Sequence, residues 1–351
     1  MSRPVYFIGP LGSVSGMIGG DSLKNLHLSN HLQKLGVELR IIDTNACRQS
    51  LSKAASAILK IIFHRKSKFI VSASSMGAYK LLKALKLLGI SDVIYWVVGG
   101  DFPNLLNCDL LSIEPYKNVK TIIVEGKRME ETLRICGLSN AITLPNFKPI
   151  DFTPAKKRTG TDLPVKFVFL SRIAEDKGCS YINKAAKLLN EKGLTNSYSI
   201  DFYGSVFETY KEQFMSEIND LPNVEYKGFL KLLDKSNYNV LASYDAMLFP
   251  TFFYGEGFAG IFIDAFIAGL PVITFDWSLN SEIIKDGETG IIVENRNAEK
   301  LAAAMERMIH HPEEIITMSK NCQSECMKFD TDHVVTRSLL ERLELIDKNQ
   351  E

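Results

Sequence analysis

The stretch Glu256-Gly257-Phe258-Ala259-Gly260-Ile261-Phe262-Ile263-Asp264 places two carboxylates eight residues apart, with only glycine, alanine and apolar residues between them. It follows an apolar run, residues 246–250, that is typical of a buried parallel strand, and it leads into residues 261–268, which predict a helix. Glu256 then lies on a loop and Asp264 about one turn inside the helix. Ligands of open α/β sheets bind at the carboxyl ends of the strands. We therefore expect both acids to contact hydroxyl groups of one extended ligand.

The residues around this stretch also predict an anion site. The N–H groups of Phe258, Ala259 and Gly260 would lie at the amino terminus of the helix, where unpaired donors and the helix dipole favour negative charge. Two cations, Arg172 and Lys177, follow another apolar strand in a second strand-to-helix loop. Such cations are what a leaving diphosphate requires if no metal is bound. The alternative is that both are solvated loop charges.

Apolar runs alternate with helical periodicity along the chain, which is the pattern of βαβ units and parallel sheets. A polar run over residues 154–162 interrupts the alternation. For 351 residues we expect two Rossmann-like domains of the α/β class, residues 1–150 and 163–330, with a cleft between their facing strand ends. A C-terminal helix at about 332–348 would pack back on the first domain. The predicted strands are residues 5–8, 38–42, 69–72, 93–98, 121–124, 141–144, 165–170, 199–203, 224–227, 246–249, 272–274 and 290–293.

Composition narrows the classes of function. The formal net charge is zero, which speaks against a general polyanion binder, and we expect no nucleic-acid partner. The halves differ, however, with 19 Lys and Arg against 10 Asp and Glu in residues 1–150, and 22 against 31 in the remainder. One half could face an anionic partner, or the surface charge is simply uneven.

The cysteines and the amino terminus bear on compartment. The six cysteines are scattered without metal-ligand spacing, so neither a metal site nor a disulfide framework is predicted. The first apolar run is too short for a signal peptide, and no run is long enough to span a bilayer. We expect a cytoplasmic protein, or one peripheral to the inner face of the membrane.

Residues 9–21 form a glycine-rich segment between the first predicted strand and helix. Glycines there allow a phosphate or sugar to approach the backbone closely, although a flexible turn explains them equally well. Their positions, 9, 12, 16, 19 and 20, do not match the dinucleotide fingerprint. An oxidoreductase is therefore disfavoured.

Several short segments fall in the order seen in one enzyme family. The chain resembles a retaining glycosyltransferase of family 4, which has the two-domain architecture called GT-B. Gly19-Gly20 matches the amino-terminal glycine pair of that family, and the resemblance covers nearly all of the chain. Its most specific motifs lie in the second half: Ser171-Arg172 with Lys177-Gly178, Phe202-Tyr203-Gly204-Ser205, Glu256-Gly257-Phe258, Gly269-Leu270-Pro271-Val272 and Asp286-Gly287-Glu288-Thr289-Gly290.

The resemblance implies a role for each matched position. Arg172 and Lys177 would hold the diphosphate of a nucleotide-sugar donor, and Glu256 would contact hydroxyls of the transferred sugar. Asp264 stands where the family usually has a glutamate that grips the ribose, and its side chain is one methylene shorter. The remaining donor-binding positions are Gly19, Gly20, Gly204, Phe229, Gly257, Phe258, Ala259 and Gly260.

One segment departs from the family pattern. Members often carry a histidine at the end of a first-half strand, whereas this chain has Gly99-Gly100-Asp101 there. Asp101 could orient the acceptor hydroxyl or accept its proton, which would make it catalytic together with Glu256, Arg172 and Lys177. The alternative is a helix cap or turn residue.

The resemblance implies transfer of a sugar to a hydroxyl acceptor with retained configuration, without a cofactor or metal. We expect a glycan or lipid-linked glycan acceptor in cell-envelope or capsular polysaccharide biosynthesis. The basic and apolar segments 58–68 and 79–88 could contact an anionic membrane. Alternatively, the second is an ordinary helix that packs Leu81, Leu82, Leu85 and Leu88 inward.

Two other functions remain open. The chain could be a non-catalytic nucleotide-sugar-binding partner of another transferase, given the missing histidine and the shortened acid. It could also be another GT-B enzyme, such as a sugar-nucleotide epimerase or a phosphorylase, because fold alone does not determine function. No motif for either enzyme is present in the sequence.

Overall fold

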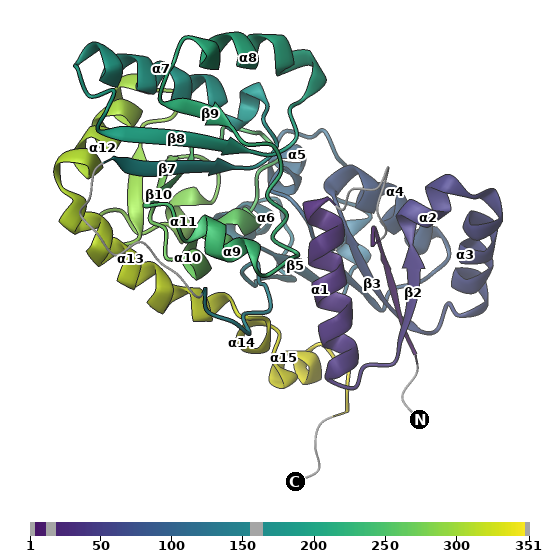
Figure 1. Ribbon diagram of the computed structural model, residues 1–351. Coiled ribbons are helices and arrows are strands. Elements are labelled where there is room, and N and C mark those ends of the chain that lie inside the picture. The colour runs from purple at the N-terminus through teal and green to yellow at the C-terminus, as the bar shows by residue number, and fades with distance from the viewer. Residues whose placement is uncertain (1–3, 12–18, 155–163, 348–351) are drawn as a thin grey trace. The chain divides into compact units, whose positions relative to one another are not determined.

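The computed structural model describes residues 4–11, 19–154 and 164–347. The chain divides into two compact units: unit 1 comprises residues 1–149 and 329–351, and unit 2 comprises residues 150–328. Each unit contains a six-stranded parallel sheet with helices packed on it (Figure 1). The predicted α/β class with two Rossmann-like domains is thereby confirmed. Most of the polar run at 154–162 lies outside the described residues.

The sheet of unit 1 has the strand order β2-β1-β3-β4-β5-β6. The order changes direction between β1 and β3, which makes their carboxyl ends the topological switch point where ligands of such sheets bind. The strands are β1 (Val5–Gly9), β2 (Leu39–Asp43), β3 (Lys68–Ala73), β4 (Val93–Val97), β5 (Thr121–Val124) and β6 (Ala141–Thr143). The helices are α1 (Gly20–Lys34), α2 (Thr44–Gln49), α3 (Leu51–Phe63), α4 (Ser75–Leu87), α5 (Phe102–Asn107), η1 (Tyr116–Asn118), α6 (Lys127–Ile135), α14 (Thr331–Val334) and α15 (Arg337–Arg342).

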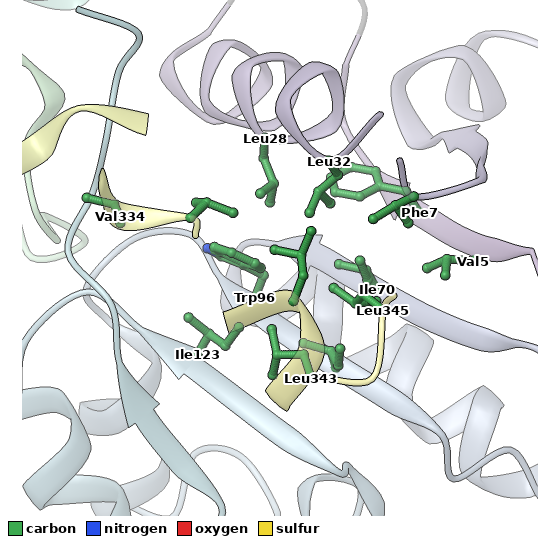
Figure 2. Close-up of a cluster of buried hydrophobic side chains, with 14 of the residues drawn as sticks. Val5, Phe7, Leu28, Leu32, Ile70, Trp96, Ile123, Val334, Leu343 and Leu345 are labelled. Carbon is green, nitrogen blue, oxygen red and sulfur yellow. The ribbon is translucent and has the colours of Figure 1, made fainter. Parts of the chain in front are cut away.

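The C-terminal segment completes the core of unit 1. Leu340, Leu343 and Leu345 belong to one cluster with Trp96 and other apolar side chains of the sheet and of α1. Figure 2 shows Leu343 and Leu345 beside the sheet. The His31 ring nitrogen Nε2 lies 2.7 Å from a backbone oxygen of this segment. A segment distant in sequence therefore covers one face of the first sheet.

The prediction of one continuous helix at about 332–348 is wrong. The structure has two short helices, α14 and α15, separated at Val335 and Thr336. Val335 has φ −103° and ψ 74°, outside the helical region, and the Thr336 hydroxyl accepts a hydrogen bond from the backbone N–H of Leu339 at 3.2 Å. Thr336 thus begins a new helix as its N-cap.

The sheet of unit 2 has the strand order β12-β11-β10-β7-β8-β9, so its switch point lies between β7 and β10. The strands are β7 (Val165–Leu170), β8 (Tyr198–Tyr203), β9 (Val224–Tyr226), β10 (Ala246–Phe249), β11 (Val272–Phe275) and β12 (Gly290–Val293). The helices are η2 (Glu175–Lys177), α7 (Cys179–Glu191), η3 (Glu208–Tyr210), α8 (Lys211–Asn219), α9 (Asn237–Leu241), α10 (Gly260–Ala268), α11 (Asn280–Ile283), α12 (Ala298–His310) and α13 (Pro312–Cys326), with η4 (Met327–Phe329) at the border of the units.

Two inner strands, β4 and β10, are apolar throughout. All residues of β4 and of β10 are buried. Parallel strands are covered on both faces, so they consist of continuous apolar runs rather than alternating ones. Polar residues that follow such strands are consequently placed at the carboxyl edge of the sheet.

Candidate functional site

The candidate site lies at the switch point of unit 2. Arg172 follows β7, and Lys177 ends the short helix η2 in the same loop. Thr251 and Glu256 lie in the loop that follows β10. Since β7 and β10 are hydrogen-bonded neighbours, both loops leave the sheet side by side.

Close backbone contacts join these two loops. Gly178 has φ +79°, and a Cβ atom there would lie 2.0 Å from the carbonyl oxygen of Pro250. The N–H of Phe252 donates a hydrogen bond to the carbonyl oxygen of Asp176 at 2.9 Å. A side chain at position 178 would separate the loops, so glycine is required there by the fold.

Gly204 serves the neighbouring turn after β8 in the same way. Its φ is +141°, and a Cβ atom would lie 1.7 Å from the carbonyl oxygen of Ser171. Its N–H donates to the carbonyl oxygen of Gly228 at 2.8 Å. Phe229 follows Gly228 and is 58% exposed. The predicted donor positions Gly204 and Phe229 therefore lie on adjoining turns, beside the residue that precedes Arg172.

Lys177 and Glu256 form an ion pair in this site. The Lys177 Nζ atom lies 2.5 Å from Glu256 Oε2, and the two side chains are only 8% and 12% exposed. The buried hydroxyl of Thr251 donates to the same carboxylate oxygen at 2.9 Å. The Ser278 hydroxyl donates to the backbone carbonyl of Glu256 at 2.6 Å. These contacts hold the carboxylate in one orientation.

Arg172 and Lys177 both lie over the ring of Phe253. Lys177 Nζ lies 4.5 Å and Arg172 Cζ 5.8 Å from the centre of this ring. Arg172 also lies over Phe207, at 5.9 Å. The Trp277 indole N–H donates to the carbonyl oxygen of Phe253 at 2.8 Å, which holds the loop in place. Both predicted diphosphate ligands thus share one aromatic support.

A cavity of about 480 Å³ opens beside Arg172. Arg172, Phe207, Phe252 and Gln213 are among its lining residues, together with both acids of η2. Lys177 and Glu256 do not line this cavity, so it adjoins the ion pair rather than containing it.

The amino terminus of α10 provides backbone donors. Ala259 is the N-cap, and no side chain forms a capping hydrogen bond there. Phe258 and Ala259 are buried, whereas Gly260 is partly exposed. The first N–H groups of α10 therefore lie at a helix end without a side-chain cap, where the helix dipole favours negative charge.

Asp264 lies one turn inside α10 and is 3% exposed. The hydroxyl of Tyr238, from α9, donates a hydrogen bond to its carboxylate. Burial, with a further contribution from Asp264, raises the pKa of Tyr238, so the hydroxyl stays protonated and remains a donor. The Phe152 ring packs edge-on against Tyr238, with 4.7 Å between ring centres. The sequence analysis missed Tyr238, and no motif or spacing signals it.

The predicted residues of unit 1 are arranged differently. Gly19 is the N-cap of α1, and its carbonyl oxygen accepts the first helical hydrogen bond, from Leu23. A Cβ atom at Gly20 would meet no atom within 4 Å. Glycine at position 20 is thus not required by the described part of the fold. Residues 12–18 of the glycine-rich segment lie outside the described residues.

Asp101 occupies the N-cap position of α5 without capping that helix through its side chain. Its carboxylate instead accepts a hydrogen bond from the buried hydroxyl of Ser75, at the start of α4.

A second polar contact that the sequence analysis missed is the buried ion pair between Lys24 of α1 and Glu125, which follows β5. No sequence spacing connects these two residues.

The described residues contain neither a metal-binding cluster nor a helix that could cross a membrane. Over residues 4–11, 19–154 and 164–347, no three His, Cys, Asp or Glu side chains gather in a way that could hold a metal ion. None of the helices in these ranges combines the length and apolar character that crossing a bilayer requires.

One protein family and several known proteins match this chain. Residues 151–325 match the family described as glycosyl transferases group 1. The chain is 24% identical over 208 residues to the amylovoran biosynthesis glycosyltransferase AmsK of Erwinia amylovora, a match that covers 58% of this chain and 50% of AmsK. It is 24% identical over 281 residues to the capsular polysaccharide biosynthesis glycosyltransferase CapM of Staphylococcus aureus, covering 72% of this chain and 71% of CapM. The match with AmsK thus spans half of that protein's length.

Solved structures share the fold over nearly the whole chain. Anabaena Alr3699/HepE, solved in complex with UDP, has a TM-score of 0.71 at 13% identity and covers 98% of this chain and 100% of its own. Sucrose-phosphate synthase from Thermosynechococcus elongatus has a TM-score of 0.76 at 15% identity, covering 97% and 98%. Residues 151–325 are therefore a glycosyl transferases group 1 segment, and the chain as a whole has the GT-B glycosyltransferase fold.

Proposed function

We propose that this protein is a retaining glycosyltransferase of family 4 that moves a sugar from a nucleoside-diphosphate donor to a hydroxyl acceptor. The observation that carries the proposal is the cluster of charged side chains at the switch point of unit 2. There, Lys177 and Glu256 form an ion pair, and Arg172 shares the Phe253 ring with Lys177. The group 1 match over residues 151–325 and the UDP complex of the structurally similar HepE support a nucleotide-sugar donor.

The cluster suits two parts of such a donor, the diphosphate and the sugar. Arg172 and Lys177 would bind the diphosphate, and the uncapped amino terminus of α10 would add N–H donors to the same negative charge. Glu256 would accept hydrogen bonds from hydroxyls of the sugar, held in position by Thr251. Charge grows on the diphosphate as the glycosidic bond breaks, so fixed cations stabilise the transition state more than the ground state.

The anomeric configuration is retained if the acceptor attacks the sugar from the same face that the diphosphate leaves. The leaving phosphate oxygen then takes the proton of the acceptor hydroxyl, and no protein nucleophile is required. We assign the diphosphate charge to protein cations and propose that activity is independent of a metal ion. Unchanged activity in excess EDTA is the expected result, and loss that added Mg²⁺ restores would contradict this part of the proposal.

The acceptor belongs to unit 1 in this proposal. Asp101, held by Ser75, would orient the acceptor hydroxyl. The names of AmsK and CapM, which concern amylovoran and capsular polysaccharide biosynthesis, support a glycan or lipid-linked glycan acceptor in envelope or capsule assembly.

Donor turnover tests the proposal. The full chain is incubated with UDP-glucose, UDP-N-acetylglucosamine and GDP-mannose, and release of the nucleoside diphosphate is followed. NMR of the released or transferred sugar gives its anomeric configuration. We expect turnover with retention, abolished by Arg172→Ala and by Glu256→Ala. Turnover with inversion contradicts the retaining mechanism.

A second function, donor binding without transfer, is favoured by one observation. The position expected to carry histidine is glycine, and Asp101 beside it is already bonded to Ser75. Wild-type protein that binds a nucleotide sugar in calorimetry, yet releases no diphosphate with any glycan acceptor, would support this function over transfer.

A further inference from the structure

Helix α3 of unit 1 exposes its apolar side chains to the outside. Leu51 is 91% exposed and Phe63 78%, and Ile58, Leu59 and Ile62 are also exposed. Ile61 is the one buried residue of this 13-residue helix. Leu51, Ile58 and Ile62 recur at helical spacing, so they form one continuous apolar stripe.

The polar side of α3 is exposed as well. Lys53, Ser56 and Lys60 lie on the side of the helix opposite to the stripe, according to their spacing. They line a cavity of about 370 Å³, whose other walls come from β2 and α2. A helix on the surface of a soluble protein normally buries its apolar side. Helix α3 instead buries only Ile61, with Ala54 and Ala57 partly covered, so its apolar stripe is left exposed.

The charge around this stripe has a single sign. Residues 44–91 contain nine basic residues and no Asp or Glu: Arg48, Lys53, Lys60, Arg65, Lys66, Lys68, Lys80, Lys83 and Lys86. Arg48 precedes the stripe, whereas Arg65 and Lys66 follow it, and all three are exposed. An anionic partner therefore fits both ends of the helix.

We propose that α3 lies in the interface of an anionic lipid bilayer. The apolar stripe would enter the acyl region, and Arg48, Arg65 and Lys66 would contact the head groups at its two ends. Thirteen residues make a helix of about 20 Å, which is too short to cross a bilayer and suits a helix that lies in its plane. The peripheral membrane contact expected from the sequence is thereby assigned to one helix.

The charge also argues against a second copy as the cover. In a symmetric dimer, the same patch lies on both subunits, so the two basic segments would face each other. Such like charges repel. A bilayer that contains anionic lipid accepts the stripe and neutralises the cations together.

The proposal goes beyond the proposed function and is tested without donor or acceptor. The full chain is sedimented with vesicles of pure phosphatidylcholine and with vesicles of equal parts phosphatidylcholine and phosphatidylglycerol. We expect binding to the anionic vesicles that is at least about tenfold tighter than to the neutral ones. No binding to either, or equal binding to both, overturns the proposal.

Two double variants separate the stripe from the charge. Ile58→Ser with Ile62→Ser, and Arg48→Glu with Arg65→Glu, should each weaken binding to anionic vesicles by at least about tenfold. The matched control, Leu110→Ser with Ile135→Ser, removes two apolar residues of unit 1 that are 68% and 77% exposed, and should bind like the wild type. Circular dichroism checks that all variants are folded.

Two results contradict the proposal. One is a control pair that weakens binding as much as the α3 pair, since any exposed apolar residue would then suffice. The other is a dimer in light scattering that Ile58→Ser with Ile62→Ser converts to monomer without changing vesicle binding, which would make a second copy the cover of α3. Neither result depends on whether the protein transfers sugar.

Discussion

The carboxyl edges of the two sheets hold their polar residues in different ways. In unit 2, Lys177, Glu256 and Arg172 share partners at the switch point, over turns that admit only glycine at positions 178 and 204. In unit 1, a side chain at Gly20 would meet none of the described residues within 4 Å. The difference indicates that the fold alone positions the candidate donor residues. In unit 1, by contrast, the described residues do not require glycine at position 20.

Removal of the Glu256 charge should have the largest effect. Glu256→Gln keeps the shape of the side chain but leaves Lys177 buried without its counter-charge, so we expect a fall in kcat of roughly 10²–10³-fold. Donor turnover by purified protein measures it. Glu306→Gln is the matched control, because it breaks the more exposed ion pair with Lys192 in the same unit and should change activity little. Equal losses of activity in both variants would contradict a specific role of the Lys177–Glu256 pair in turnover.

A side chain at Gly204 should destabilise unit 2. In Gly204→Ala the new methyl group would meet the Ser171 carbonyl oxygen in a backbone conformation that alanine disfavours. We expect the free energy of unfolding to fall by about 2–4 kcal/mol, measured by urea denaturation. A loss below about 0.5 kcal/mol would mean that this turn can relax, and the contrast between the units would lose one of its supports.

Loss of the Tyr238 hydroxyl should cost less. In Tyr238→Phe the buried Asp264 carboxylate loses a donor, so the free energy of unfolding should fall by about 1–3 kcal/mol. The KM for the donor should rise if Tyr238 also positions Asp264 for the ribose. Tyr181→Phe is the control, since the Tyr181 side chain shows ring contacts only among the described residues. Identical stability of both variants would argue against the hydrogen bond.

The smallest change in stability is expected at Gly20. In Gly20→Ala the methyl group has space, and alanine favours the first turn of α1, so the free energy of unfolding should stay the same or rise by up to about 1 kcal/mol. Donor turnover should nevertheless fall if a ligand approaches this position. Turnover at the wild-type level would contradict a role for Gly20 in the site.

Much of the fold could be predicted because buried parallel strands are continuous apolar runs. The runs at 165–170 and 246–249 coincide with β7 and β10, which also located Arg172 and Glu256 at strand ends. The apolar stretch after Glu256 likewise predicted α10, with Asp264 inside it. Local sequence is sufficient for these features, since each depends on residues close to one another in the chain.

Features that depend on distant residues could not be predicted. Lys177 and Glu256 are 79 positions apart, and no pattern pairs them. Nor could periodicity reveal which side of α3 faces the protein. An amphipathic pattern places the apolar residues on one side of a helix but does not show whether that side is buried or exposed. For the second basic segment, the inward packing expected for α4 is correct for Leu82 and Leu85, while Leu88 is 41% exposed.

The central claim is that unit 2 binds a nucleoside-diphosphate sugar through Arg172, Lys177 and Glu256. A thermal-shift screen with UDP-, GDP- and other nucleotide sugars tests it most directly, because a bound donor stabilises the folded state by mass action. At least one donor should raise the melting temperature of the wild type and of Asp101→Ala, but not that of Arg172→Ala. No shift with any nucleotide sugar, or an equal shift in Arg172→Ala, would contradict the claim.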